Sequence, residues 1–127
     1  MKKTLNFLLI FGLGASCYCL LETLWRGYTH WTMGLTGGAC LTTLYQLAKR
    51  TKDWSLAAKA AVGSGIITAY EFTVGCLVNL KLGWNVWDYS GLPLNLAGQI
   101  CLLFSFLWFL LCFPVFGLCK FLRKNME

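Results

Sequence analysis

The sequence predicts an all-α integral membrane protein, a bundle of four transmembrane helices with both termini in the cytoplasm. Of its 127 residues, 57% are hydrophobic and only 13% are charged, whereas a soluble domain carries about 25% charged residues. Residues 5–21, 27–48 and 89–119 hold no charge at all. These observations exclude a soluble domain, a disordered chain and a disulfide-built secreted module, and they predict one domain over residues 1–127.

Four segments in turn meet the length of about 20 predominantly apolar residues that a spanning helix needs. The first runs over about residues 5–25. The second, about 27–47, is rich in Thr and Gly but uncharged, and the third, about 54–80, contains two charged residues. The fourth, about 96–119, is apolar on all sides, and Pro114 is expected to kink it.

The basic residues predict how these spans are oriented. Arg26 and Lys81 follow the first and third spans, whereas the other nine of the 11 basic residues fall on the opposite side of the bundle. The positive-inside rule therefore places both termini in the cytoplasm. The same asymmetry accounts for the net charge of +6, so the sequence predicts the lipid bilayer as a partner and no nucleic acid.

Polar residues gather near the predicted outer ends of the four spans, where the topology would bring them into the outer third of one bundle. Glu71, Gly75 and Asn79 share one face of the third helix at a spacing of four residues. Placing an ionised carboxylate in hydrocarbon costs about 2.5–3.5 kcal/mol or more. The presence of these carboxylates within predicted spans therefore requires a structural or functional explanation. The members of this cluster are Glu22, Arg26, His30, Glu71, Asn79, Asp88, Asn95 and Gln99.

Two interpretations of this cluster are open. In the first, it is an internal network that fixes helix register, with Glu22 paired to Arg26 and with Glu71 protonated or bonded to Asn79 or Thr68. In the second, it is an outward-facing pocket that binds a substrate, an ion or a lipid head group. Arg26 would then hold an anionic group, and Glu71 and Asn79 would accept a cation or a proton.

Two further function classes also remain open. The first is an enzyme acting on a lipid head group or envelope intermediate, with acid and base drawn from Glu22, His30, Glu71 and Asp88. No nucleophile elbow, phosphate loop or metal-ligand spacing accompanies these residues, so no cofactor or metal is predicted. The second is an assembly or helper protein that uses small-residue faces such as Gly34-x-x-x-Gly38 and Ala61-x-x-x-Gly65. We expect these glycines to pack the chain's own helices.

Three separated motifs are the run Glu22–Met33, the Glu71–Gly75–Asn79 stripe, and Trp87-Asp88-Tyr89-Ser90 with Pro93, Asn95 and Gly98-Gln99-Ile100-Cys101. Together they resemble the CmpB-like permeases, a bacterial family of type IV ABC-transporter membrane proteins. The resemblance covers about residues 15–115 and implies a transporter or permease component with four helices in the bacterial cytoplasmic membrane. The chain has no P-loop, so the resemblance implies a separate ATPase or another membrane subunit, or a homo-oligomer.

Overall fold

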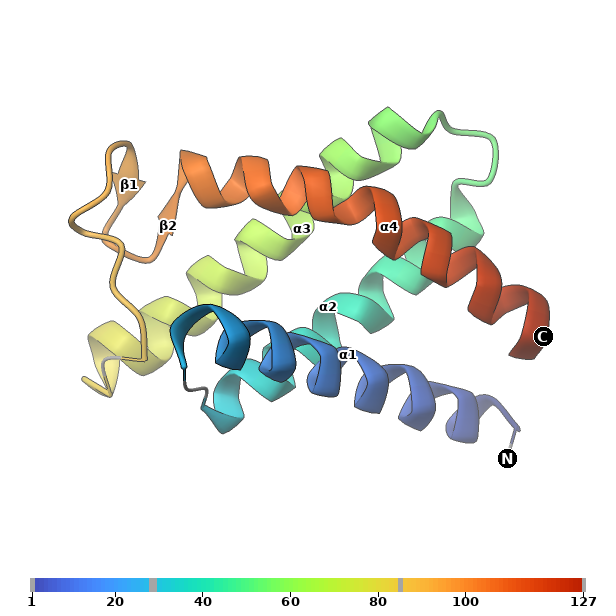
Figure 1. Cartoon of the computed structure of the whole chain (residues 1–127), viewed down its shortest axis with the longest axis horizontal. Coiled ribbons are helices and arrows are strands. Elements are labelled where there is room, and N and C mark those ends of the chain that lie inside the picture. The colour runs from blue at the N-terminus through green and yellow to red at the C-terminus, as the bar shows by residue number, and fades with distance from the viewer. Residues whose placement is uncertain (1, 28–29, 85, 127) are drawn as a thin grey trace. The chain divides into compact units, whose positions relative to one another are not determined.

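The computed structural model describes residues 2–27, 30–84 and 86–126 and confirms the all-helical class. A six-residue π-helix, η1, extends the third of four α-helices, and two short strands pair antiparallel before the fourth (Figure 1). The elements are α1 (Lys2–Arg26), α2 (Trp31–Arg50), α3 (Leu56–Gly75), η1 (Cys76–Lys81), β1 (Asn95–Leu96), β2 (Ile100–Cys101) and α4 (Leu102–Met126).

Within the described ranges, three helical segments are long and apolar enough to cross a membrane. They are Thr4–Leu24, Leu56–Lys81 and Leu102–Asn125. The chain divides into two compact units, which are described separately. Unit 1 comprises Met1–Lys52 and Gly117–Glu127, and unit 2 comprises Asp53–Phe116.

In unit 1, glycines let α1 and α2 approach closely. A Cβ added at Gly37 would lie 2.8 Å from the carbonyl oxygen of Gly14, and one at Gly38 would lie 2.6 Å from the ring of Phe11. At Gly34 it would lie 3.3 Å from the sulfur of Cys19. Gly34 and Gly38 therefore pack against the chain's own first helix, as the sequence predicts, and the contact at Gly38 leaves no room for a side chain. The same expectation does not hold for Gly65 of α3, where an added Cβ would meet no described atom within 4 Å.

Three threonine hydroxyls of α2 are satisfied within the helix itself. The hydroxyls of Thr36, Thr42 and Thr43 each donate to the carbonyl oxygen four residues earlier, at 2.8 Å in each case. Near the end of α2, the carbonyl oxygen of Ala48 accepts a hydrogen bond from Nη1 of Arg123, a residue of α4, at 3.3 Å. The threonines lower the hydropathy of α2, but they leave no hydroxyl donor that requires water.

In unit 2, polar contacts join α3 to α4. The hydroxyl of Ser64 donates to the carbonyl oxygen of Ser105 at 2.6 Å, and the hydroxyls of Thr68 and Ser105 lie 2.8 Å apart. Ser64 and Thr68 lie on the α3 face that also carries Glu71. Interhelical hydrogen bonds of this kind, together with small residues, hold membrane helices together where no hydrophobic force distinguishes protein from lipid.

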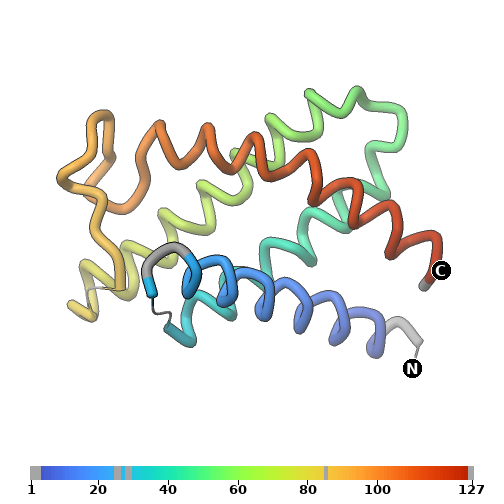
Figure 2. Tube along the Cα trace, in the orientation of Figure 1, coloured from blue at the N-terminus to red at the C-terminus, as the bar shows by residue number. Residues whose placement is uncertain are grey.

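The connection from α3 to α4 contains regular structure of its own, a π-helix and a short hairpin. In η1 the backbone N–H of Leu82 reaches the carbonyl oxygen of Leu77 at 3.0 Å, five residues back, which is the π-helical pattern. Helix α4 begins at Leu102, whereas the sequence suggested a fourth span from about Leu96. The intervening residues form the β1/β2 hairpin, in which Leu96 pairs with Ile100 (Figure 2).

Candidate functional site

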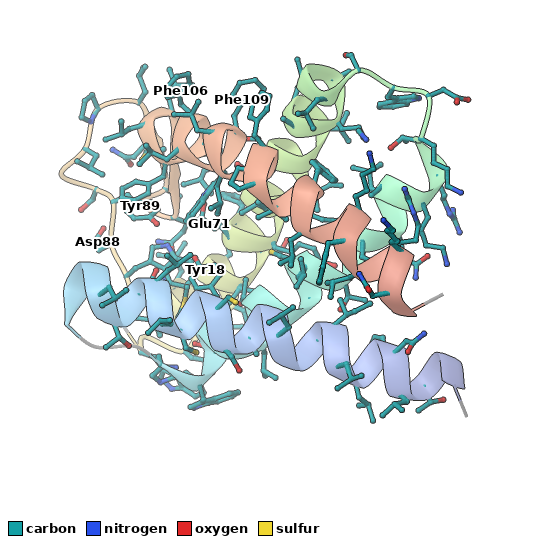
Figure 3. All side chains as sticks on the ribbon, turned by 45° about the vertical axis from the view of Figure 1, so that its right-hand side comes forward. Tyr18, Glu71, Asp88, Tyr89, Phe106 and Phe109 are labelled. Atoms are coloured by element: carbon teal, nitrogen blue, oxygen red, sulfur yellow. The ribbon has the colours of Figure 1, made fainter. Side chains whose placement is uncertain are left out.

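Glu71 is a deeply buried carboxyl group of unit 2, with 1% of its surface exposed. The hydroxyl of Tyr89 donates to Oε2 at 2.9 Å, and the indole N–H of Trp108 donates to Oε1 at 2.7 Å. Figure 3 shows the labelled Glu71 and Tyr89 side chains beside each other. The ring of Tyr89 is in turn stacked on Phe104, with centroids 4.8 Å apart. Each carboxylate oxygen therefore accepts a hydrogen bond from a neutral aromatic donor.

Two turns further along, Asn79 fixes the start of the connecting loop. Its Nδ2 donates to Gln99 Oε1 at 2.7 Å, and its Oδ1 accepts the backbone N–H of Val86 at 2.6 Å and that of Trp87 at 3.3 Å. Gln99 is 2% exposed, and its Nε2 donates to the carbonyl oxygen of Ala97 at 2.9 Å. One side chain on η1 thus holds both arms of the loop through partly buried hydrogen bonds.

Gly75, between these two residues, provides the space that the loop occupies. A Cβ at this position would lie 2.5 Å from Gln99 Oε1 and 2.9 Å from Cζ2 of Trp87. The indole N–H of Trp87 donates to the carbonyl oxygen of Gln99 at 3.0 Å, so the ring and the amide form one buried layer on the helix. The face predicted from the spacing of Glu71, Gly75 and Asn79 is therefore the face that holds the loop.

Asp88 and Asn95 organise the loop itself. Asp88 is exposed, and its Oδ1 accepts the backbone N–H of Ser90 at 2.8 Å. Hydrogen bonds from the Ser90 backbone and hydroxyl lower the pKa of Asp88 below 3.8. Asn95 Nδ2 donates to the carbonyl oxygens of Leu92 at 2.8 Å and Ser90 at 3.3 Å, and its Oδ1 accepts the N–H of Gly98 at 3.0 Å.

The remaining predicted site residues lie in unit 1. Glu22 is half-buried on α1, and the side chain of Arg26 lies outside the described part of the structure. His30 caps α2, where its Nδ1 accepts the N–H of Thr32 at 3.2 Å and lies 2.7 Å from the Thr32 hydroxyl. In this geometry Nδ1 is an acceptor, so a neutral His30 carries its proton on Nε2. Five of the predicted site residues therefore lie in unit 2, namely Glu71, Asn79, Asp88, Asn95 and Gln99. Their convergence with the three predicted residues of unit 1 stays a prediction.

The sequence interpretation missed the two donors to Glu71. It expected Asn79 or Thr68 as partners, but these side chains are bonded to Gln99 and Ser105. The signal for Trp108 is its position deep inside an apolar span, away from the ends where tryptophans usually anchor a helix. Tyr89 lies in a recognised motif, but nothing in its spacing connects it to Glu71. Among the described residues, no group of three or more His, Cys, Asp or Glu side chains could hold a metal ion.

Comparison with known proteins gives the context for this site. Residues 4–126 match the family described as "Putative ABC-transporter type IV". The chain belongs to this family. No curated protein and no solved structure matches the chain. The match covers the Glu71 site as well as the three helices that are apolar enough to span a membrane, which is consistent with a multi-pass membrane component of this transporter family.

Proposed function

We propose that the chain is a membrane subunit of a transport system in the bacterial cytoplasmic membrane, and that Glu71 is the group that accepts a cation or a proton. The observation that carries this proposal is a carboxylate 1% exposed on a helix suited to span a membrane. Ionisable residues at membrane depth are costly and typically mark ion, proton or substrate pathways. The neutral donors Tyr89 and Trp108 can stabilise the charged carboxylate without neutralising it.

The proposed topology has four spans, in which α2 crosses the membrane in addition to the three apolar segments. Its threonine hydroxyls are satisfied by the helix's own carbonyl groups, so a segment of modest hydropathy carries little unsatisfied polarity into the bilayer. With four spans, nine of the 11 basic residues fall on the side of the two termini, which supports a cytoplasmic location for both. A separate ATPase would supply the nucleotide hydrolysis.

The proposed substrate-binding set is the one predicted from the sequence, with different roles for its members. Glu22, Arg26 and His30 of unit 1 are proposed to bind substrate, with Arg26 holding an anionic group, and Glu71 of unit 2 to accept a cation or a proton. Asn79, Asp88, Asn95 and Gln99 would support the Glu71 site by holding the loop, since their side chains are engaged with the loop backbone or with one another.

The test compares Glu71→Gln with Tyr89→Phe. The first variant removes the carboxylate charge and keeps the side-chain shape, whereas the second removes one donor and keeps the charge. Native mass spectrometry of each protein, released from its own membrane without harsh delipidation, reports retained small molecules and subunit number. We expect Glu71→Gln to lose a ligand that Tyr89→Phe retains. If the wild-type protein and both variants carry the same set of bound molecules, the proposed role of Glu71 is wrong.

A second candidate function is a non-catalytic membrane assembly subunit. The observation that favours it is that many polar side chains of unit 2 bond to the chain's own backbone or to one another, as in a scaffold. On this alternative, Glu71→Gln and Tyr89→Phe would both lower thermal stability without altering any bound molecule, and a stable protein partner would co-purify with the wild type. An enzyme acting on a lipid head group would instead change the lipid extract of an overproducing strain.

A further inference from the structure

The loop between η1 and α4 exposes apolar side chains at its tip and at both of its ends. Leu94 is 73% exposed and Leu96 is 57% exposed; these two residues are called the leucine tip. Between Lys81 and Lys120 the sequence holds a single charge, that of Asp88. The other large apolar side chains exposed in this region are Leu80, Leu82, Trp84, Leu102 and Leu103.

The exposure of the leucine tip is built into the loop by its backbone. Leu94 adopts a φ of +56° and Ala97 a φ of +55°, in the left-handed region that is strained for residues with a Cβ. Asn95, between the two leucines, turns inward and bonds the loop backbone at Leu92, Ser90 and Gly98. The hydrogen bonds of Asn95 therefore hold the loop in a shape that directs Leu94 and Leu96 outward.

The position of the loop indicates what covers the leucine tip. The loop leaves one candidate span at Lys81 and enters the next at Leu102, and both ends lie at the same end of unit 2 (Figure 2). If these helices cross the bilayer, the loop emerges at the level of the lipid head groups. Beyond β2, the first turn of α4 again exposes apolar side chains, those of Leu102 and Leu103.

We propose that the leucine tip inserts into the boundary between the head groups and acyl chains of the outer leaflet, so that its partner is the lipid surface itself. The same loop exposes Trp84, and exposed leucine and tryptophan side chains are suited to this layer. Because the loop has one acidic and no basic residue, insertion depends on apolar burial and not on anionic lipids. The inference rests on the proposed topology, but it does not depend on transport.

The test places a nitroxide at position 94 of the full chain in phosphatidylcholine vesicles, through a genetically encoded ketone amino acid that leaves the seven native cysteines untouched. Collision rates with oxygen, which partitions into lipid, and with a water-soluble nickel chelate report depth. Matched labels at Leu110, exposed on α4, and at Asp53, exposed between α2 and α3, give the lipid and water references. A label at position 96 repeats the test at a second site.

We expect the ratio of oxygen to nickel collisions at positions 94 and 96 to exceed that at position 53 severalfold, and to lie below that at position 110. A ratio equal to that at position 53 would place the tip in water and overturn the proposal. Low collision rates with both reagents would show a second protein copy over the tip and would also overturn it. If the label at position 110 reads as aqueous, the proposed span fails as well, so the two failures are distinguishable.

Discussion

Replacement of Gly75 by alanine tests the packing of the loop against the helix. The added Cβ would lie 2.5 Å from Gln99 Oε1 and 2.9 Å from the ring of Trp87. Both neighbours are held in place, because Gln99 accepts a hydrogen bond from Asn79 and Trp87 donates one to the Gln99 carbonyl. The methyl group therefore cannot be accommodated unless this layer moves.

The magnitude follows from three opposing effects. Alanine favours a helix interior over glycine by about 1 kcal/mol. Overpacking of a close contact costs about 1–3 kcal/mol, and loss of the Asn79–Gln99 hydrogen bond costs about 1 kcal/mol more. We expect Gly75→Ala to lower the free energy of unfolding by about 1–3 kcal/mol.

Gly65→Ala on the same helix is the matched control. A Cβ at Gly65 would meet no atom within 4 Å, so this substitution gains helix propensity alone and should raise the unfolding free energy by up to about 1 kcal/mol. The assay is equilibrium unfolding in mixed micelles, followed by far-UV circular dichroism and by tryptophan fluorescence. Shifts of the same sign and size for Gly65→Ala and Gly75→Ala would falsify the packing described for Trp87 and Gln99.

Two further predictions concern the α1–α2 contact and the acidic turn of the loop. Gly37→Ala, whose Cβ would lie 2.8 Å from the Gly14 carbonyl oxygen, should loosen the helix pair and lower the midpoint of thermal unfolding, whereas Gly12→Ala, with no atom within 4 Å, should not. Hydrogen bonds from Ser90 lower the pKa of Asp88, so the turn is formed while the carboxylate is ionised and opens as the pH falls through that lowered value. The Ser90 amide resonance should therefore stay fixed between about pH 7 and pH 5 and move only under more acidic conditions.

The sequence predicted the helices better than the connection between the third and the fourth. Long apolar segments define the helices, because hydropathy over about 20 residues needs no knowledge of tertiary contacts. The start of α4 was placed too early since Leu96 and Ile100 are apolar like the helix that follows. What stops the helix there is local, namely the positive φ of Ala97 and Gly98 and the hydrogen bonds of Asn95.

The sequence predicted which residues of the candidate site share a helix face, but not which residues from other elements contact them. The four-residue spacing of Glu71, Gly75 and Asn79 follows from helix geometry, so their common face could be anticipated. The contact with Trp108 depends on how α4 is rotated toward α3, and with Tyr89 on how the loop folds back. Neither rotation nor loop path is encoded in the periodicity of a single segment.

The π-helical turn at Cys76–Lys81 has a consequence for comparing sequences within this family. Its hydrogen bonds join residues five apart instead of four, so a π-turn contains one residue more than an α-turn. A relative with an uninterrupted α-helix would need one residue fewer to place an asparagine at the height and angle of Asn79. An alignment of such a relative should therefore carry a single-residue gap within this turn, and that gap marks a change in helical winding with no loss of the loop contact.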